Sequence, residues 1–598
     1  MKAETTLYDI ILPPEDAEPE THDLYLRSRG EVLVDSAAAL HMRGSDDSAA
    51  WAAFDTYVNA FAQDRWKTYT RLGTVALKVR LRGSCRISLY AVDAHNRESL
   101  TASHQVEART EAQEFVLPFP DTDAVLLTWS LAGEDCALFS ASYVTEVPVE
   151  FVNPVRLGVV ICTFRRERNA RALMAALARS VDAGACAEDD LRVFLVDNGR
   201  TMDDSVCVRP WMKLVPNRNA GGSGGFARGM LEVLDNTGFQ ATHLLLMDDD
   251  IELPDGALQK TFSLLRLLRP EYASACIGGA MFDLRQKYMH YASVETTSGI
   301  FFAHRTFGDI DVRCREDFLP LAMDGRCPRQ YQAWWYCVYP SDIPARYGLP
   351  YPFFFQQDDI EYFIRSELKY VIHLNGIFVW HESFHLKETN AKNVYTYKNF
   401  LIFTALRPSM RLPIYARIAR DMLFSILSFN YKNFMALRMA ANIFLEGPEQ
   451  MRRENIYEEL LEKAKLCDDE LVDLSEYARF RTTDTDQPKL SSWRKAVMAL
   501  TLNGHFLPDF CLGECAWVSR NRQLGAIFLK KTLCHAADSS GYGTVRRISI
   551  KALFREIRLL VPVLAGLVRR KAAVGKRYRD MYAEMTSAEW AREHLSAD

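Results

Sequence analysis

The chain has 598 residues, of which 48% are hydrophobic and 25% charged, which is enough for about three or four globular domains. Its net charge of −5 argues against a nucleic-acid partner, since such proteins carry strongly basic surfaces. The 13 cysteines form no CxxC pair, and the first residues contain no apolar signal core. No apolar run reaches the roughly 18 residues of a spanning helix, so we expect a cytoplasmic protein with reduced thiols.

Residues 1–152 are predicted to form an all-β domain. Short segments there alternate apolar and polar residues, which is the pattern of half-buried antiparallel strands. The clearest segments are residues 31–35, 74–80, 85–92 and 124–129. Such a series at short spacing favours a sandwich or jelly roll. Modules of this kind bind carbohydrate or mediate assembly, and the sequence does not select between these uses.

Residues 153–400 are predicted to form an α/β domain. Apolar runs at 155–162, 191–197 and 244–247 predict buried strands, and helical spacing at 167–181 separates the first two. This alternation favours a Rossmann-like, mostly parallel sheet. Residues 401–598 contain helix-compatible sequence with no convincing strand, so we expect a C-terminal helical domain.

Three consecutive carboxylates, Asp248, Asp249 and Asp250, follow the apolar run at 244–247. Crowding like charge at the end of a buried strand predicts a counter-cation. Carboxylate oxygens suit Mg²⁺ and Mn²⁺, and nucleotides bind at the carboxyl ends of strands in α/β sheets. The alternative is a cluster that caps a following helix.

Two loops are candidates for holding a nucleotide. Thr163, Phe164 and Arg165 follow the first α/β strand, where a polar loop can contact a base and a diphosphate; a solvated loop is the alternative. The segment 217–229, which includes Asn219, holds four glycines between positions 221 and 225. Glycines allow a ligand to approach the backbone, and a helix beginning near Gly225 would direct its N-terminus at an anion. The alternative is a flexible linker.

Further polar and aromatic residues are candidates for chemistry. Asp358, Asp359 and Glu361 stand at the head of a predicted helix and can supply a general base, or can form an ordinary acidic first turn. His381 is a candidate metal ligand or a structural histidine. The adjacent Trp334 and Trp335 suit a sugar face, or pack in a core.

Taken in order, these motifs resemble the GT-A inverting glycosyltransferases of family 2. The motifs are Thr163-Phe-Arg165, Val196-Asp-Asn198, Asp248-Asp-Asp250, Asp358-Asp-Ile-Glu361 and Trp380-His381. The chain is most similar to the polymerising galactofuranosyltransferases of mycobacterial cell-wall galactan synthesis. Those proteins combine an N-terminal β-sandwich, a GT-A domain and a helical C-terminal region, so the resemblance implies the same fold here.

The resemblance also implies roles for individual residues. Asp248, Asp250 and His381 match the metal ligands, Asp359 matches the catalytic base and Asp358 its neighbour. The acceptor residues are matched by Trp334, Trp335 and Glu361. The UDP site is matched by Thr163, Phe164, Arg165, Asp197, Asn219, Asp248 and Asp249. Ala220 and the Glu-Ser-Phe sequence after His381 depart from the family pattern, and the loop 296–329 contains no motif that aligns.

The activity implied is an inverting, Mn²⁺- or Mg²⁺-dependent transfer of galactofuranose from UDP-galactofuranose. The acceptor would be a growing, lipid-linked cell-wall or surface galactan, and the new linkages would be β. Two alternatives remain at this stage. One is a family 2 transferase of another sugar, rhamnosyl or galactopyranosyl, and the other is a non-catalytic carbohydrate-binding scaffold.

The segment 545–579 contains eleven Lys or Arg residues and one acid, Glu556, interleaved with apolar residues. This composition favours an amphipathic segment at an anionic membrane surface. The alternative is a solvated basic helix packed on its own domain. We therefore expect a peripheral protein on the inner face of the cell membrane, with homo-oligomerisation left open.

Overall fold

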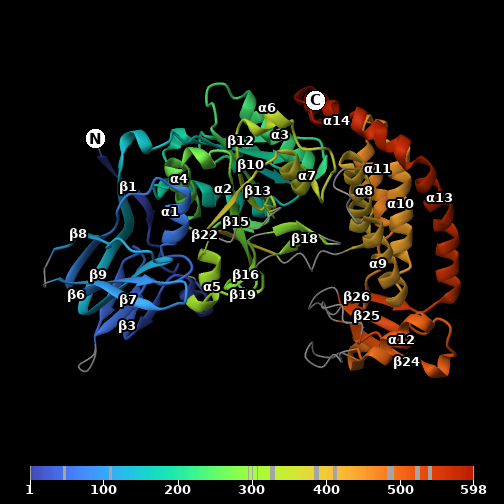
Figure 1. Cartoon of the computed structure of the whole chain (residues 1–598), viewed down its shortest axis with the longest axis horizontal. Helices are drawn as coiled ribbons and strands as arrows, with labels where there is room; N and C mark the ends of the chain where they lie inside the picture. The colour runs from blue at the N-terminus through green and yellow to red at the C-terminus, as the bar shows by residue number, and fades with distance from the viewer. Residues whose placement is uncertain are drawn as a thin grey trace.

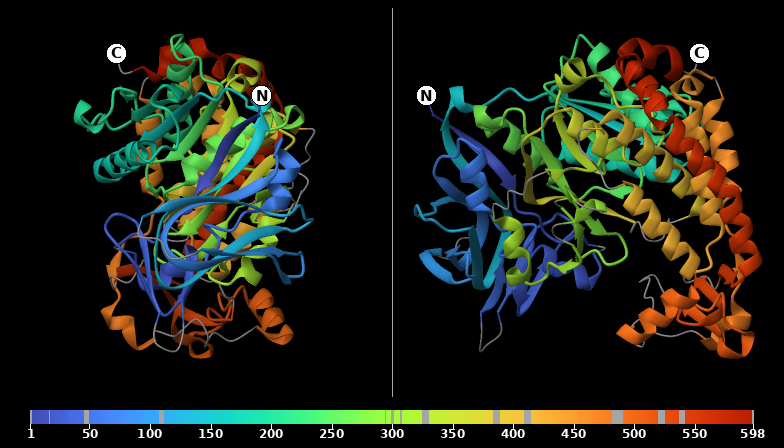
Figure 2. Two further views of the ribbon diagram at one scale, coloured as in Figure 1. Left: turned by 90° about the vertical axis from the view of Figure 1, so that its left-hand side faces the viewer. Right: turned by 45° about the vertical axis from the view of Figure 1, so that its right-hand side comes forward.

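The computed structural model describes residues 2–15, 17–44, 49–106, 111–293, 295–298, 301–305, 308–323, 330–382, 389–408, 414–453, 455–480, 490–518, 525–536 and 542–596. Figure 1 shows a β-rich region, a central sheet with helices, and a group of long helices arranged in that order along the longest axis. Figure 2 shows the same three regions from two other sides. The boundaries predicted at 152 and 400 stay predictions.

The N-terminal region is built on one sheet in which nine described strands pair antiparallel. They are β1 (Lys2–Asp9), β2 (Arg27–Arg29), β3 (Glu31–Val34), β4 (Leu40–Arg43), β5 (Ala50–Ala53), β6 (Val75–Val92), β7 (Glu98–Val106), β8 (Gln113–Pro118) and β9 (Leu126–Pro148). The long strands β6 and β9 pair along their lengths and bend at irregularities near Arg80 and Ser84. Strands dominate this region as predicted, with the short helix α1 (Gln63–Tyr69) added, and the sandwich form stays a prediction.

The central region contains a ten-stranded mixed sheet. Its parallel part consists of β12 (Met212–Pro216), β11 (Leu191–Asp197), β10 (Leu157–Thr163) and β13 (His243–Asp248). It continues through β21 (Tyr336–Pro340), β15 (Cys276–Asp283), β16 (Met289–Ala292) and β19 (Ile310–Asp311), with β14 (Ile251–Glu252) and β22 (Val371–His381) beside them. The apolar runs are continuous because both faces of these strands are covered. The predicted α/β order is confirmed, but the sheet is mixed rather than mostly parallel. β21 runs antiparallel to both of its neighbours, and β14, β16 and β19 also pair antiparallel.

Helices α2 (Glu167–Asp182), α3 (Gly221–Asp235) and α4 (Ala257–Leu267) connect the strands of the first half of this sheet. A smaller antiparallel sheet contains β17 (Glu295–Ser298), β18 (Phe301–Arg305) and β20 (Gln330–Tyr331). Three short helices complete the region: α5 (Arg315–Ala322), α6 (Ile343–Tyr347) and α7 (Asp358–Arg365).

The C-terminal region is mainly helical, as predicted, but it also holds a sheet. Its helices are α8 (Asn390–Leu406), α9 (Ile414–Leu427), α10 (Lys432–Glu446), α11 (Ile456–Lys465), α12 (Ser492–Thr501), α13 (Ile550–Asp580), α14 (Tyr582–Met585) and α15 (Ala588–Leu595). The sheet is formed by β23 (Val472–Asp473), β26 (Tyr542–Arg547), β25 (Lys530–Ala536) and β24 (Gly513–Val518). The expectation of no strand was wrong because these short segments carry no clear alternation, and pairing between distant segments stabilises them.

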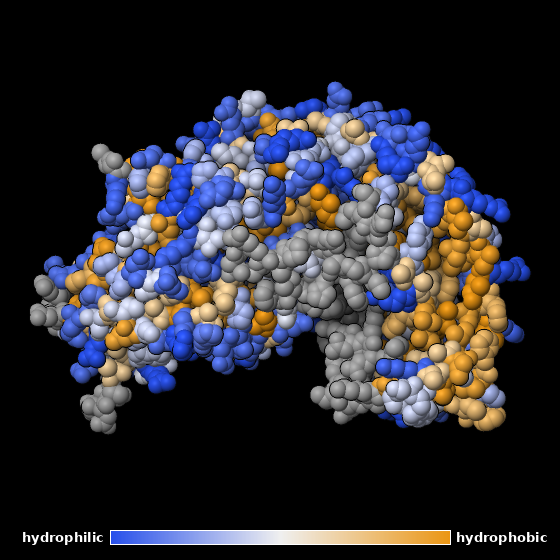
Figure 3. All heavy atoms as spheres, in the orientation of Figure 1, coloured by the Kyte–Doolittle hydropathy of each residue, from blue (hydrophilic) through white to orange (hydrophobic). Residues whose placement is uncertain are grey.

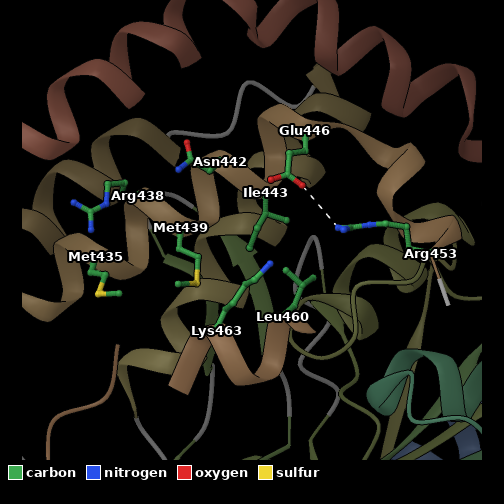
Figure 4. A pocket seen from close by; sticks show the side chains of 9 residues that line it. All are labelled: Met435, Arg438, Met439, Asn442, Ile443, Glu446, Arg453, Leu460 and Lys463. Atoms are coloured by element: carbon green, nitrogen blue, oxygen red, sulfur yellow. Dashed lines mark ion pairs between the residues drawn. The ribbon is translucent and has the colours of Figure 1, made fainter. Parts of the chain in front are cut away.

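A shallow cavity opens on the helices α10 and α11 (Figure 4). Its lining residues are Met435, Arg438, Met439, Asn442, Ile443, Glu446, Arg453, Leu460 and Lys463. None of them is a predicted site residue. At its edge, Arg453 pairs with Glu446 at 3.9 Å.

The N-terminal sheet is joined to the central region by buried polar contacts. The Asp9 backbone N–H donates to Gln259 Oε1 at 2.9 Å, which ties β1 to α4. The buried Lys260 of α4 donates to the Val58 carbonyl at 2.6 Å and to the Asn375 carbonyl at 3.3 Å. Burial lowers the pKa of Lys260 to about 7. Because Asn375 belongs to β22, these contacts tie the first region to the strand that ends at His381.

Helix α3 begins at Gly221, four residues before the expected start, and the predicted linker alternative is therefore wrong. Gly221 has φ +68°, and a Cβ there would lie 2.0 Å from the Phe354 carbonyl oxygen. The next residue, Gly222, has open space: the nearest atom to its Cβ would be Asp358 Oδ2 at 3.8 Å. Of these two positions, only Gly221 therefore requires glycine.

We predict that Gly221→Ala lowers the free energy of unfolding by about 2 kcal/mol or more, since a left-handed backbone and a steric clash act together. Gly222→Ala serves as the matched control and should change it by less than about 1 kcal/mol, because alanine is accepted in a helical turn. Urea denaturation followed by circular dichroism measures both. Equal losses for the two variants would contradict the predicted role of Gly221.

Candidate active site

Strand register brings several predicted residues to one edge of the central sheet. β10 pairs in parallel with β11 so that Thr163 stands beside Asp197. β10 also pairs with β13, which places Cys162 beside Asp248. These residues terminate their strands, so their side chains gather at the carboxyl edge where ligands bind in open α/β sheets.

Asp248, Asp250 and His381 form a cluster at this edge. β14 pairs with β22 so that Ile251 stands opposite His381, which brings the imidazole next to Asp250. His381 Nε2 lies 3.1 Å from Asp250 Oδ1 and 3.8 Å from Asp248 Oδ2. One ligand atom from each residue lies within 4.8 Å of the others. The structure therefore assembles all three predicted ligands from segments more than a hundred residues apart.

The cluster has the chemistry of a divalent cation site. Two carboxylates and an imidazole suit Mn²⁺, and two carboxylates with water suit Mg²⁺. Burial, followed by repulsion from Asp250, raises the pKa of Asp248 to about 6. His381 Nδ1 lies 2.6 Å from the Glu382 carbonyl oxygen, so a proton on Nδ1 donates to that oxygen. The lone pair of Nε2 then faces the cluster and is available to a cation. The residues present fit Mn²⁺ or Mg²⁺.

Asp249 faces into the protein rather than toward the cluster. Thr163 Oγ1 donates to Asp249 Oδ2 at 2.7 Å, and Arg166 Nη1 donates to Asp249 Oδ1 at 2.8 Å. The same guanidinium nitrogen lies 2.9 Å from Asp250 Oδ2. Arg166 is therefore a bridge that orients two of the three acids. The sequence analysis missed it, although it directly follows the Thr163-Phe-Arg165 motif.

The Asp197 carboxylate also accepts hydrogen bonds from within the protein. Its Oδ1 accepts from the Gly199 N–H at 2.8 Å, and its Oδ2 accepts from the N–H groups of Thr201 and Met202 at 2.7 and 2.8 Å. Such a carboxylate shapes the turn after β11. A direct contact of Asp197 with uridine stays a prediction.

Three other predicted nucleotide residues lie nearer to solvent. Phe164 is exposed, and the Arg165 guanidinium lies 5.1 Å from the centre of its ring. Arg165 has φ +55°, a conformation that non-glycine residues rarely adopt and that often marks a functional loop. The partly buried Asn219 accepts from the Gly221 N–H at 3.2 Å through Oδ1, at the start of α3.

Asp358 and Asp359 occupy the first turn of α7. Asp358 is buried, and its Oδ2 faces the start of α3 beside Gly222. Burial raises the pKa of Asp358 to about 7, with a further contribution from Asp248. Burial and then the charge of Asp358 hold the pKa of Asp359 well above its usual range. A carboxyl group whose pKa is raised toward the working pH accepts a proton more strongly when ionised, which suits general-base catalysis.

The turn before α7 is held in an unusual conformation. Phe354, Gln356 and Gln357 have φ values of +79°, +70° and +61°. Two residues of α8 hold this turn: Lys398 Nζ donates to the Phe353 carbonyl at 3.0 Å, and Asn399 Nδ2 donates to the Gln356 carbonyl at 2.8 Å. The sequence analysis missed both, because buried polar residues on a helix give no pattern.

Trp334 and Trp335 are buried, with 5% and 3% of their surfaces exposed. Trp334 Nε1 donates to the Tyr339 hydroxyl at 3.0 Å, and Trp335 Nε1 donates to the Gly279 carbonyl at 2.8 Å. The two indoles therefore pack inside the protein, which favours the core alternative over a platform for a sugar face.

Glu361, the third predicted acceptor residue, is fully buried. Its oxygens accept from Arg365 Nε at 3.2 Å and Arg365 Nη2 at 3.0 Å. A carboxylate held in this way is not available to an acceptor hydroxyl, so the structure favours a structural role. Residues 383 and 384, which follow Glu382, lie outside the described residues, as do residues 299–300, 306–307 and 324–329 of the loop 296–329.

Comparisons with known proteins identify the relatives of this chain. The family model described as Galactofuranosyltransferase 2 N-terminal matches residues 7–145. Galactofuranosyltransferase GlfT2 of Mycolicibacterium smegmatis is 25% identical over 477 residues, covering 75% of this chain and 72% of the relative. GlfT2 of Mycobacterium tuberculosis is 24% identical over 484 residues, covering 75% and 74%.

The chain resembles the galactofuranosyltransferases named GlfT2. The resemblance predicted from the sequence motifs is thereby confirmed. Among solved structures, the mannosyltransferase PcManGT from Pyrobaculum calidifontis in complex with GDP-Man and Mn²⁺ aligns with 13% identity and a TM-score of 0.27. The alignment covers 53% of this chain and 88% of the mannosyltransferase.

We predict that Asp250→Asn weakens Mn²⁺ binding by at least about tenfold, since a ligand oxygen loses its charge. Glu252→Gln is the matched control, because Glu252 is exposed on β14 and pairs with Lys287 at 2.7 Å. Isothermal titration of MnCl₂ into the purified protein measures the affinity. Unchanged affinity in Asp250→Asn, or equal weakening in both variants, would contradict the metal site.

Proposed function

We propose that the protein is an inverting glycosyltransferase that moves galactofuranose from UDP-galactofuranose to a growing galactan. One observation supports this above the others. The Asp248, Asp250 and His381 cluster shares an edge with the paired carboxylates of α7, in a chain that resembles proteins named galactofuranosyltransferase. The arrangement suits a nucleotide diphosphate on one side and an acceptor hydroxyl on the other.

Mn²⁺ or Mg²⁺ would be held by Asp248, Asp250 and His381, and when bound it would supply positive charge to the diphosphate leaving group. Arg166 keeps the Asp250 carboxylate oriented through its 2.9 Å contact. The backbone N–H groups at the start of α3 add positive potential for an anion beside Asn219. The protein therefore orients the donor before the reaction begins.

Asp359 would act as the base. The acceptor hydroxyl gives its proton to the Asp359 carboxylate while its oxygen forms a bond to the anomeric carbon. The bond between that carbon and the diphosphate oxygen breaks in the same step, and UDP leaves with the electron pair. A single displacement inverts the anomeric centre, so an α-linked donor gives a β-galactofuranoside.

We predict that Asp359→Asn lowers kcat by roughly a hundredfold or more, because the amide cannot accept the proton. The Kd for UDP should change by less than about threefold, since the side chain acts in the transition state. Glu367→Gln is the control, an exposed carboxylate just beyond the end of α7. Substantial kcat in Asp359→Asn would move the base to another residue.

The donor and the product are tested together. Purified protein with Mn²⁺ and a lipid-tailed galactofuranosyl acceptor should add galactofuranose units from UDP-galactofuranose, read by mass spectrometry. The anomeric coupling constant in the proton NMR spectrum should show β linkages. Transfer from UDP-galactopyranose or a rhamnose nucleotide, without transfer from UDP-galactofuranose, would favour the alternative donor.

We also propose that the long helix α13 seats the protein on an anionic membrane surface. One stripe of this helix is buried in the protein, at Leu553, Leu560, Leu567, Val574 and Tyr578. The stripe that follows it, about 100° around the helix, exposes Phe554, Val561 and Val568, at 57%, 56% and 74%. Figure 3 shows apolar surface gathered at this end of the molecule. The basic residues of the segment complement anionic lipid.

None of the helices that the structure describes is both long and apolar enough to cross a membrane. The proposal is peripheral binding on the inner face of the cell membrane.

We predict that wild-type protein sediments with anionic phospholipid vesicles at low salt and less so at high salt. The double variant Val561→Asp/Val568→Asp should stay in the supernatant. Leu33→Asp/Leu100→Asp is the control, since these residues are equally exposed, at 59% and 60%, on the N-terminal sheet. Unchanged sedimentation of the α13 variant would contradict the proposal.

A further inference from the structure

The last part of the chain contacts both helices that carry the candidate active site. This segment, residues 582–596, contains α14 and α15 and is called the C-terminal clasp below. It follows α13 directly and returns across the central region, as Figure 1 shows at the C-terminus. Three anchors hold it, one on α7, one on the turn after α6, and one on α3.

The first anchor is the contact that Tyr582, at the start of α14, makes with α7. Its hydroxyl donates to Glu361 Oε1, on the carboxylate that also binds Arg365. The centre of the Tyr582 ring lies 5.4 Å from the Arg365 guanidinium and 5.7 Å from that of Arg407. Glu361 and Asp358 are three residues apart on a helix of two turns, so this anchor fixes the base-bearing turn.

The middle anchor is Thr586. Its carbonyl accepts from the Leu349 N–H at 2.7 Å. The neighbouring Gly348 has φ +81°, and a Cβ there would lie 2.8 Å from the same carbonyl oxygen. This close approach holds the clasp against the chain that leads from α6 to α7.

The third anchor is α15 on the start of α3. The Leu595 carbonyl accepts from the Arg218 N–H at 3.3 Å, one residue before Asn219. The Leu595 side chain is fully buried, and a Cβ on Gly224 would lie 3.2 Å from its Cδ2. Arg228 Nη1 donates to Ser596 Oγ at 2.8 Å on the next turn of α3.

We infer that the C-terminal clasp is a positioning element of the active site. It sets the turn that carries Asp359 against the glycine turn at the start of α3, across which donor and acceptor must meet. The inference rests on the proposed function for what the two turns bind. A misplacement of about 1 Å between reacting groups can lower the rate about a hundredfold. A segment that fixes the relative positions of the two turns can therefore affect catalysis strongly.

The two ends of the clasp should affect different kinetic quantities. None of the anchoring side chains reaches the metal cluster or Asp359, so each acts through the helix that it supports. Loosening the α15 anchor disturbs the glycine turn and should weaken donor binding. Loosening the Tyr582 anchor disturbs α7 and should lower kcat with donor binding unchanged.

The first test is Leu595→Ala beside Leu567→Ala. Both leucines are buried, at 0% and 4% exposure, but Leu567 lies on the inner stripe of α13. Both variants should lose similar thermal stability, since each removes a buried leucine side chain and leaves a cavity. Leu595→Ala alone should raise the Kd for UDP in the presence of Mn²⁺ about tenfold, and should speed amide hydrogen exchange in peptides that cover residues 217–224.

The second test is Tyr582→Phe beside Tyr578→Phe. Tyr578 is one turn earlier, is buried, and stacks on Phe444 at 5.3 Å rather than contacting Glu361. Tyr582→Phe should lower kcat about fivefold or more with the Kd for UDP within twofold of wild type. Tyr578→Phe should change neither quantity.

The outcomes separate this inference from the proposed function. If wild-type protein binds no UDP while Leu595→Ala still speeds exchange at residues 217–224, the proposed function fails and the positioning role stands. If wild-type protein binds UDP and Leu595→Ala matches Leu567→Ala in Kd and exchange, the inference is overturned. Equal kinetic behaviour of the two tyrosine variants would also overturn it.

Discussion

The central physical constraint in this protein is the crowding of carboxylates at one edge of a buried sheet. Asp248, Asp249, Asp358 and Asp197 all surround Cys162, whose thiol pKa is held well above its usual value by burial and by these charges. Two like charges about 4 Å apart repel by about 4 kcal/mol at an effective dielectric constant of about 20. Arg166 offsets part of this repulsion, and a divalent cation would offset more. The crowded acids therefore favour a bound cation, and burial together with the same repulsion raises the pKa of the acids at the start of α7.

The rest of the fold keeps this edge in place. β22 contains both Asn375, whose side chain donates to the Tyr57 and Ala60 carbonyls of the N-terminal region, and His381 at the metal cluster. α8 holds the turn before α7 by hydrogen bonds to backbone carbonyls. The left-handed conformations at Gln356 and Gln357 persist because these contacts over-determine them. The helical C-terminal region thus supports the turn that bears the proposed base.

Part of this arrangement follows from sequence, for identifiable reasons. Three acids after four buried apolar residues mark a strand end, and strand, helix, strand order predicts parallel pairing, which the structure confirms for β10, β11 and β13. The partners of individual side chains could not be predicted. Glu361 shares the acidic first turn with Asp358, yet Arg365 and Tyr582 take its oxygens, and Tyr582 is 221 residues away in sequence. The buried positions of Trp334 and Trp335 and the C-terminal sheet likewise depend on contacts between distant segments, which leave no local pattern.

The proposed function depends most on a metal–diphosphate site at Asp248, Asp250 and His381. One diffraction measurement tests this site directly. Crystals grown with MnCl₂ and UDP should be measured at the manganese absorption edge. The anomalous difference map should show one strong peak bonded to Asp248, Asp250 and His381, with the UDP diphosphate on the side that faces the start of α3. A peak at other residues, or UDP bound elsewhere with these three side chains free of metal, would contradict the account.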